Sequence, residues 1–144
     1  MHIHRPIIAA LLLGVTPLAA YSAAPEGSAE ALVARHLAAS AKGDVEGTVA
    51  DYSDDAVTIS PGGVTRGKEE LRKLFTGIFG GAPGSRPPPL VVQQQVYAGE
   101  IGYITWTQNA GTPQEVHGSD TFVVRNGRIV AQTVAIVALH PPAK

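Results

Sequence analysis

The stretch HGSDTFVVRNGRIVAQTVAIVAL, residues 117–139, predicts a long β-hairpin, and this hairpin decides the fold. Two runs rich in β-branched residues flank Asn126-Gly127. This dipeptide best tolerates the positive φ angles of a tight type I′ turn. Side chains alternate between the two faces of a strand. Asp120, Phe122 and Val124 therefore share one face of the first strand, and Gln132, Val134 and Ile136 share one face of the second.

Asp120 is the unusual member of these sets, because its neighbours on the same face are apolar. A carboxylate in such a position lies either at a sheet end in water or in a pocket with polar partners. Only the second of these locations would make Asp120 a candidate functional residue.

Composition narrows the classes of function. The chain has 144 residues, 44% of them hydrophobic and 16% charged, with a formal net charge of −1. One globular domain with an ordinary core is therefore expected, and no basic field favours nucleic acid. The chain has no Cys, which excludes disulfides, thiolate metal sites, a Cys nucleophile and a lipidated cysteine.

Residues 1–24 have the pattern of a secretory signal peptide. Arg5 precedes an apolar run, and Ser22 and Ala24 suit the −3 and −1 positions of a cleavage site. An uncleaved anchor is the alternative, although Pro17 and the shortness of the run disfavour a membrane span. We expect one mature domain, residues 25–144, that is secreted or periplasmic and not bound to membranes.

Periodicity and capping residues predict the remaining elements. Helices are expected at 29–42, 45–52 and 68–79, and strands at 56–60, 64–66, 90–98 and 101–108, before the hairpin. Residues 80–89, GGAPGSRPPP, cannot form a regular element. Helices early and strands late indicate an α+β domain in which one curved antiparallel sheet packs on three helices.

These segments together resemble the nuclear transport factor 2-like superfamily, and within it the SnoaL-like polyketide cyclase group and the ketosteroid isomerases. The resemblance covers residues 31–137. It lies in VARHLAA at 33–39, YSDDAV at 52–57, GKEEL at 67–71 and DTFVVRNGRIV at 120–130. It implies a cone-shaped sheet around a pocket, and this fold serves many unrelated functions.

The resemblance to ketosteroid isomerases also implies roles for single residues. Asp120 falls at the position of their oxyanion-hole Asp, His36 at that of their Tyr, and Ser60 at that of their catalytic Asp. A Ser hydroxyl without an adjacent base cannot take a proton from a carbon acid near neutral pH. We therefore predict that this protein is not a ketosteroid isomerase of that mechanism.

Two residues are the candidates for chemistry. Asp120 is interpreted as a pocket carboxyl whose pKa is raised by apolar neighbours, or else as a structural carboxylate paired with Arg or His. His36 lies on the apolar face of the first helix. It is interpreted as an acid/base partner of Asp120, or else as a core histidine bonded to a backbone carbonyl.

Seven further residues are predicted to line a ligand pocket: Ser60, Tyr52, Tyr103, Thr105, Phe122, Gln132 and Val134. Tyr103 and Thr105 share a strand face, and Trp106 is expected on the opposite, outer face as a candidate dimer contact.

Other polar residues have plainer interpretations. His117 is expected to face outward, and no ligand spacing supports a metal site, so no metal or cofactor is predicted. Asp54 and Asp55 suit a turn. The basic residues between positions 66 and 73 alternate with Glu69 and Glu70, which indicates a solvated helix face.

Two functions from different classes remain. The first is a pocket for a small apolar organic molecule, with cofactor-independent isomerase, cyclase or hydrolase-type chemistry. The second is a non-enzymatic exported module that works through binding or dimerisation. A homodimer formed through the sheet is expected, and a nucleic-acid partner is not.

Overall fold

The computed structural model describes residues 24–81 and 86–138, and the predicted signal peptide therefore lies almost entirely outside the described residues. The elements in chain order are α1 (Ala29–Lys42), α2 (Val45–Ala50), β1 (Tyr52–Ser60), β2 (Gly63–Arg66), α3 (Lys68–Phe79), β3 (Val91–Ala98), β4 (Ile101–Gln108), β5 (Val116–Arg125) and β6 (Arg128–Ala138). None of the described helices has the length and apolar run that a membrane span needs.

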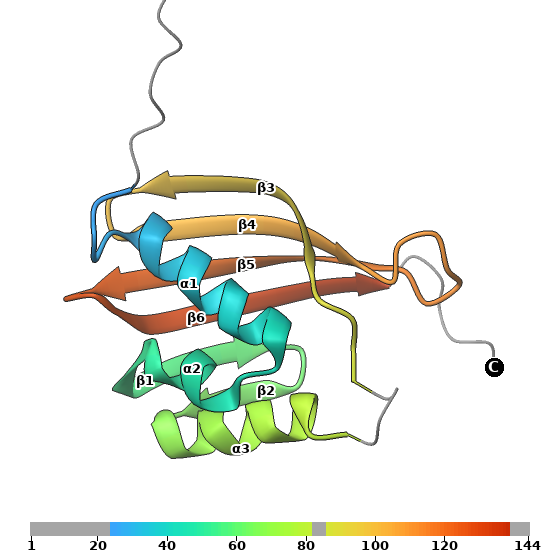
Figure 1. Cartoon of the computed structure of the whole chain (residues 1–144), viewed down its shortest axis with the longest axis horizontal. Helices are drawn as coiled ribbons and strands as arrows, with labels where there is room; N and C mark the ends of the chain where they lie inside the picture. The colour runs from blue at the N-terminus through green and yellow to red at the C-terminus, as the bar shows by residue number, and fades with distance from the viewer. Residues whose placement is uncertain (1–23, 82–85, 139–144) are drawn as a thin grey trace, which may run out of the picture.

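One curved, unclosed sheet holds the six strands in the order β2-β1-β6-β5-β4-β3. Figure 1 shows α1 crossing one face of this sheet, while α3 runs beside β1 and β2. Contacts of α1 with β4 and β5, and of α3 with β1 and β2, agree with this view. The fold is the α+β architecture that the sequence predicts.

The predicted hairpin is confirmed. β5 and β6 pair antiparallel, with Asp120 opposite Val134 and Phe122 opposite Gln132. Asn126 and Gly127 have φ angles of 50° and 68°, the left-handed values of a type I′ turn. The register therefore places the polar Asp120 and Gln132 on one inner face with the apolar residues around them.

Local sequence also explains α1. Ser28 is the N-cap, and its hydroxyl accepts a hydrogen bond from the Ala31 amide at 3.2 Å. Gly43 ends the helix with a φ of 69°, a conformation that glycine adopts without steric cost. The face between these caps buries Leu32, Val33 and His36 against the sheet.

The region around Tyr52 differs from the prediction in two ways. The second helix ends at Ala50, and β1 begins at Tyr52 and includes residues 53–55, which were predicted as a turn. β1 also pairs with β6 in parallel, whereas an antiparallel sheet was predicted. A register shift between Tyr52 and Val57 absorbs the turn-forming residues, and burial of the Tyr52 ring outweighs their local preference.

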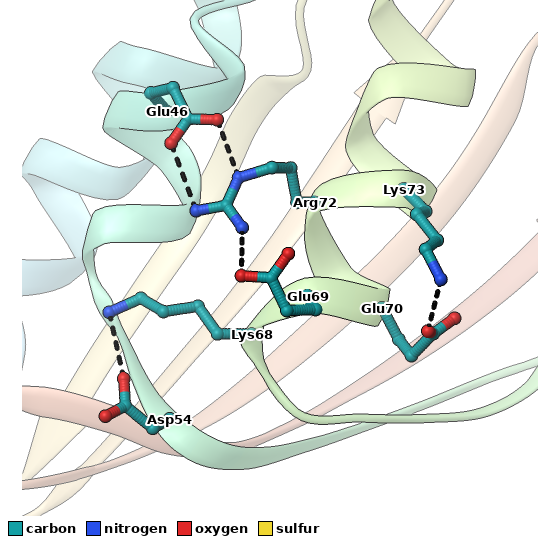
Figure 2. A network of polar contacts seen from close by, with 7 residues as sticks. All are labelled: Glu46, Asp54, Lys68, Glu69, Glu70, Arg72 and Lys73. Carbon is teal, nitrogen blue, oxygen red and sulfur yellow. Dashed lines mark hydrogen bonds and ion pairs between the residues drawn. The ribbon is translucent and has the colours of Figure 1, made fainter.

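The predicted solvated face of α3 is a set of ion pairs, shown in Figure 2. The Arg72 guanidinium donates to Glu46 of α2 at 2.7 Å and to Glu69 at 2.6 Å. Lys73 pairs with Glu70 at 2.6 Å. These cations are matched by carboxylates at the surface, so this face connects α2 to α3 and offers no unbalanced site for an anion.

Candidate functional site

A cavity of about 310 Å³ lies between α1, α3, the inner face of the sheet and the segment before β3. Its polar lining includes His36, Arg86, Gln108, Asp120 and Gln132. Apolar side chains form most of the remaining wall: Leu37, Phe75, Ile78, Phe79, Pro87, Leu90, Val92, Trp106, Val134 and Ile136. A mainly apolar cavity of this size with few polar groups suits a small organic molecule.

Asp120 stands on β5 within this cavity and is only 5% exposed. Its Oδ1 accepts a hydrogen bond from the Trp106 indole Nε1 at 2.9 Å, and its Oδ2 accepts one from Gln132 Nε2 at 2.8 Å. No ion pair joins Asp120 to another residue of the described chain. Neutral donors alone therefore face this carboxyl.

Burial raises the pKa of Asp120, and the hydrogen bonds from Trp106 and Gln132 only partly oppose that effect. The pKa rises because desolvation disfavours the charged form and no nearby cation compensates for it. A carboxyl of this kind can accept or release a proton closer to neutral pH than an ordinary Asp.

Tyr52 and Gln132 form a second set of polar groups that holds Asp120 in place. The Tyr52 hydroxyl donates to Gln132 Oε1, which leaves the Gln132 amide group directed at Asp120. Burial and the charge of Asp120 raise the pKa of Tyr52, so this hydroxyl stays protonated and remains a donor. The chain of donors from Tyr52 to Asp120 thus has one direction and orients the carboxyl.

Gly118 explains how Trp106 reaches Asp120. Trp106 pairs with Gly118, and Ile104 pairs with Asp120, so the indole must lie along the strand to make its bond. A Cβ at position 118 would lie 2.1 Å from Trp106 Cζ2. Only glycine leaves room for the ring in that position.

His36 enters the same cavity from α1 and is 3% exposed. Its ring packs edge-on against Tyr52 and Phe122, with centroid distances of 5.3 and 5.7 Å. Burial lowers the pKa of His36 to about 4, although the Asp51 carboxylate and the Thr48 carbonyl favour the charged ring. His36 is therefore a neutral imidazole at neutral pH.

The segment before β3 forms one wall of the cavity and is fastened by side chains. Arg86 donates to the backbone carbonyls of Ala41 at 2.5 Å and Lys42 at 2.9 Å, at the end of α1. These carbonyls lack partners within the helix, and a cation there also compensates the helix dipole. Gln108 Nε2 donates to the Pro88 carbonyl at 2.5 Å.

The structure brings together four of the predicted site residues, Asp120, His36, Gln132 and Val134, which all line the cavity. Tyr52 and Phe122 are completely buried behind them and touch the cavity residues rather than the cavity. Ser60 is not among the described lining residues. It is half-buried near the end of β1, where its Oγ accepts from the Gly62 amide at 3.2 Å.

The expected faces of β4 were reversed. Tyr103 and Thr105 were predicted to line the cavity and Trp106 to face outward, but Trp106 lies inside and is 4% exposed. Tyr103 and Thr105 border a separate outer depression of about 350 Å³ that His117 also lines. Alternation along β4 was right, but its face depends on the pairing of Ile104 with Asp120, which one strand cannot reveal.

Three residues of the site escaped the sequence analysis as site residues. Trp106 had been assigned to the wrong face, and Arg86 lies in a segment without periodicity. Asp51, 2% exposed, lay in the last turn of the predicted helix 45–52, where an Asp is usually at the surface. The one available signal was the pair of Gly118 and Trp106, because a glycine opposite a tryptophan indicates space for the ring. This pair is recognised only once the register of β4 and β5 is known.

His117 behaves as predicted, since it is exposed and its Nε2 lies 2.8 Å from Glu115 Oε1. Within residues 24–81 and 86–138, no group of three or more His, Asp or Glu side chains is arranged to bind a metal ion.

Comparisons with known proteins agree with this architecture. An NTF-2 like protein of unknown function from Burkholderia xenovorans LB400 has 20% sequence identity and a TM-score of 0.63, over 80% of this chain and 85% of that one. A "putative polyketide cyclase" from Sinorhizobium meliloti has 15% identity and a TM-score of 0.63, over 73% and 94%. At these identities the likeness shows the fold alone.

A third similar structure is TerC co-crystallised with polyporic acid, at 15% identity and a TM-score of 0.62, over 75% of this chain and 90% of that one. No curated protein matches the sequence. The family model of the SnoaL-like domain matches residues 33–132, a span that contains most of α1, Asp120 and most of the residues that line the cavity. The chain therefore belongs to the SnoaL-like domain family, with a nuclear transport factor 2-like fold.

Proposed function

We propose that this domain binds a small, mainly apolar organic molecule in the cavity and that Asp120 exchanges a proton with it. One observation carries the proposal: a buried carboxyl with a raised pKa, held by neutral donors, opens into a mainly apolar cavity. Such a group can serve proton transfer of the isomerase, cyclase or hydrolase type without a cofactor.

Two proteins of similar fold support an organic ligand. One is described as a "putative polyketide cyclase", and the other was co-crystallised with polyporic acid. The position of Ser60 away from the cavity lining supports a chemistry other than that of the ketosteroid isomerases, whose base position it occupies in the resemblance.

Binding of 2-naphthol and of naphthalene, followed by fluorescence, tests this proposal. The wild type should bind both, and Asp120→Asn should weaken 2-naphthol about tenfold, because a hydrogen bond to a carboxylate is stronger than one to an amide. Naphthalene has no hydroxyl, so its affinity should stay unchanged. Asp55→Asn, an exposed carboxylate, is the matched control. Equal weakening of both ligands by Asp120→Asn would contradict the proposed role.

A non-enzymatic dimerisation module is the second candidate. It is favoured by exposed apolar side chains on the outer face of the sheet: Val96 at 51%, Ile101 at 48% and Val137 at 60%. If neither naphthalene nor 2-naphthol binds the wild type, this candidate becomes the better one. The signal-peptide pattern of residues 1–24 supports the further proposal that either function is performed after export.

A further inference from the structure

Two buried polar atoms face each other behind the cavity without ordinary hydrogen bonds. His36 Nδ1 and Asp51 Oδ2 are 3.9 Å apart, and both side chains are less than 5% exposed. Neither atom has another hydrogen-bond partner within the described structure. Buried polar atoms nearly always find partners, and hydrogen bonds of a site often shorten when a ligand is bound. The two atoms are therefore each other's natural partners.

Arg35 determines which oxygen of Asp51 faces His36. Its Nε and Nη2 both contact Oδ1, at 2.7 and 2.6 Å. The guanidinium balances the charge of the buried carboxylate, while Oδ2 stays directed at the imidazole. Arg35 and His36 are successive residues of α1, so one helix turn supplies both the cation and the ring.

We infer that Asp51 is a positioning residue that holds the proton of neutral His36 on Nδ1, which leaves Nε2 as the unprotonated nitrogen of a ring that lines the cavity. A neutral imidazole has one donor and one acceptor nitrogen, and the acceptor is decided by the partner of the other nitrogen. This inference rests on the proposed ligand-binding function for its consequence, but its test does not.

The consequence is a preference among ligands. The cavity gains a hydrogen-bond acceptor on α1, in addition to the carboxyl of Asp120 on β5. Ligands that carry a hydroxyl, an N–H or an acidic C–H are favoured over apolar molecules of equal size. Because burial lowers the pKa of His36 to about 4, Nε2 stays an acceptor throughout the neutral range.

Several other polar groups surround His36. The Tyr52 hydroxyl is neutral and occupied by Gln132, and Arg35 is directed at Asp51. Asp120 and Arg86 line the same cavity from β5 and the segment before β3. The Thr48 backbone carbonyl also favours a proton on the ring, and it is the one alternative to Asp51 as the group that sets the tautomer.

The variant Asp51→Asn separates the two alternatives. Arg35 requires an oxygen at the Oδ1 position, so the new amide must place its NH₂ group at the Oδ2 position, facing His36. An NH₂ group donates, and Nδ1 must then be the unprotonated nitrogen. The tautomer should therefore reverse, with the proton on Nε2, as a merely structural role of Asp51 would not require.

Nitrogen-15 NMR of the His36 ring at pH 7 measures this directly. The wild type should show the proton on Nδ1, and Asp51→Asn should move it to Nε2, whereas the control Asp54→Asn, at an exposed carboxylate, should leave it on Nδ1. A proton on Nε2 in the wild type would overturn the inference even if Asp51→Asn failed to fold. A proton that stays on Nδ1 in Asp51→Asn would assign the tautomer to Thr48 and overturn it as well. Failure of naphthol binding would leave these spectra unaffected.

Discussion

Asp51 and Asp120 are both buried carboxylates, but they are stabilised in different ways. Asp51, at the end of α2, receives two contacts from the Arg35 guanidinium on one oxygen. Asp120, in the middle of β5, receives one hydrogen bond on each oxygen, from the neutral donors of Trp106 and Gln132. Around Asp51 a cation balances the charge of the carboxylate, whereas around Asp120 the neutral donors only orient the carboxyl.

The difference separates a supporting role from a reactive one. One oxygen of Asp51 is occupied by the Arg35 guanidinium and the other faces His36, so this carboxylate supports its neighbours and presents no oxygen to the cavity. A carboxyl that is desolvated without a cation has a raised pKa and remains available to a ligand. The cavity opens onto Asp120 and not onto Asp51, which reaches it only through His36.

The largest expected effect is on the pH dependence of the free energy of unfolding, and it comes from His36, the neighbour of Asp51. The pKa of His36 is about 4 in the folded protein, against 6.5 for an ordinary, solvated histidine. The unfolded chain therefore binds more protons between these values, and the folded state should lose about 3 kcal/mol as pH falls from 6.5 to 4. Urea unfolding of the wild type and of His36→Gln across this range measures the difference.

Of the wild type and His36→Gln, only the wild type should show this loss of stability, because the carboxylates contribute equally to both curves. Asp120 acts with the opposite sign, because its raised pKa favours the folded state as pH falls. His117→Gln, which changes an exposed histidine, is the matched control and should retain the wild-type slope. A His36→Gln curve parallel to that of the wild type would show that His36 is not buried as a neutral ring.

A middle-sized effect is expected on the Asp120 side, at Gly118. Gly118→Ala would bring a methyl group against the Trp106 ring, displace the indole from Asp120 and lower the free energy of unfolding by about 2 kcal/mol. Trp106 is the only tryptophan, so a red shift of its fluorescence reports the displacement. Gly77→Ala is the control, since nothing lies within 4 Å of its new Cβ. Unchanged emission in Gly118→Ala would refute the proposed packing.

The smallest effect tests charge balance at Asp51. Arg35→Met leaves that carboxylate buried without its cation and should cost about 1 to 2 kcal/mol, less than for a fully buried pair because the Arg35 side chain is 57% exposed. Thermal unfolding measures the change. Arg125→Met removes an exposed pair with Glu100 and should have little effect. Equal costs for the two variants would remove the distinction between Asp51 and a surface carboxylate.

Much of the fold was predictable from local patterns. α1 and α3 have the bounds that capping and apolar periodicity predict, and β5 and β6 follow from Asn126-Gly127. These elements are decided within a few residues, so a single sequence contains the necessary information. The start of β1 at Tyr52 was missed, because burial of that ring and pairing with β6 override the turn-forming residues after it.

The site was predictable only in part. Asp120, His36 and Gln132 could be found because each is a polar residue on an otherwise apolar face. Tyr103 and Trp106 were assigned to the wrong faces, since the inner side of β4 is chosen by its register with β5. Arg35 and Asp51 had no sequence signal, because their pairing depends on how α1 and α2 pack.

The sequence by itself determined the hairpin, the capped helices and the presence of one carboxylate among apolar strand residues, since these depend on neighbours two to four positions away. The tertiary structure decided which face of each strand is inner, which donors reach Asp120 and which carboxylate receives a cation. Those outcomes depend on contacts between residues far apart in the chain, such as Tyr52 with Gln132 and Arg35 with Asp51. Burial then sets the pKa of Asp120 and His36, and burial is a property of the packed molecule.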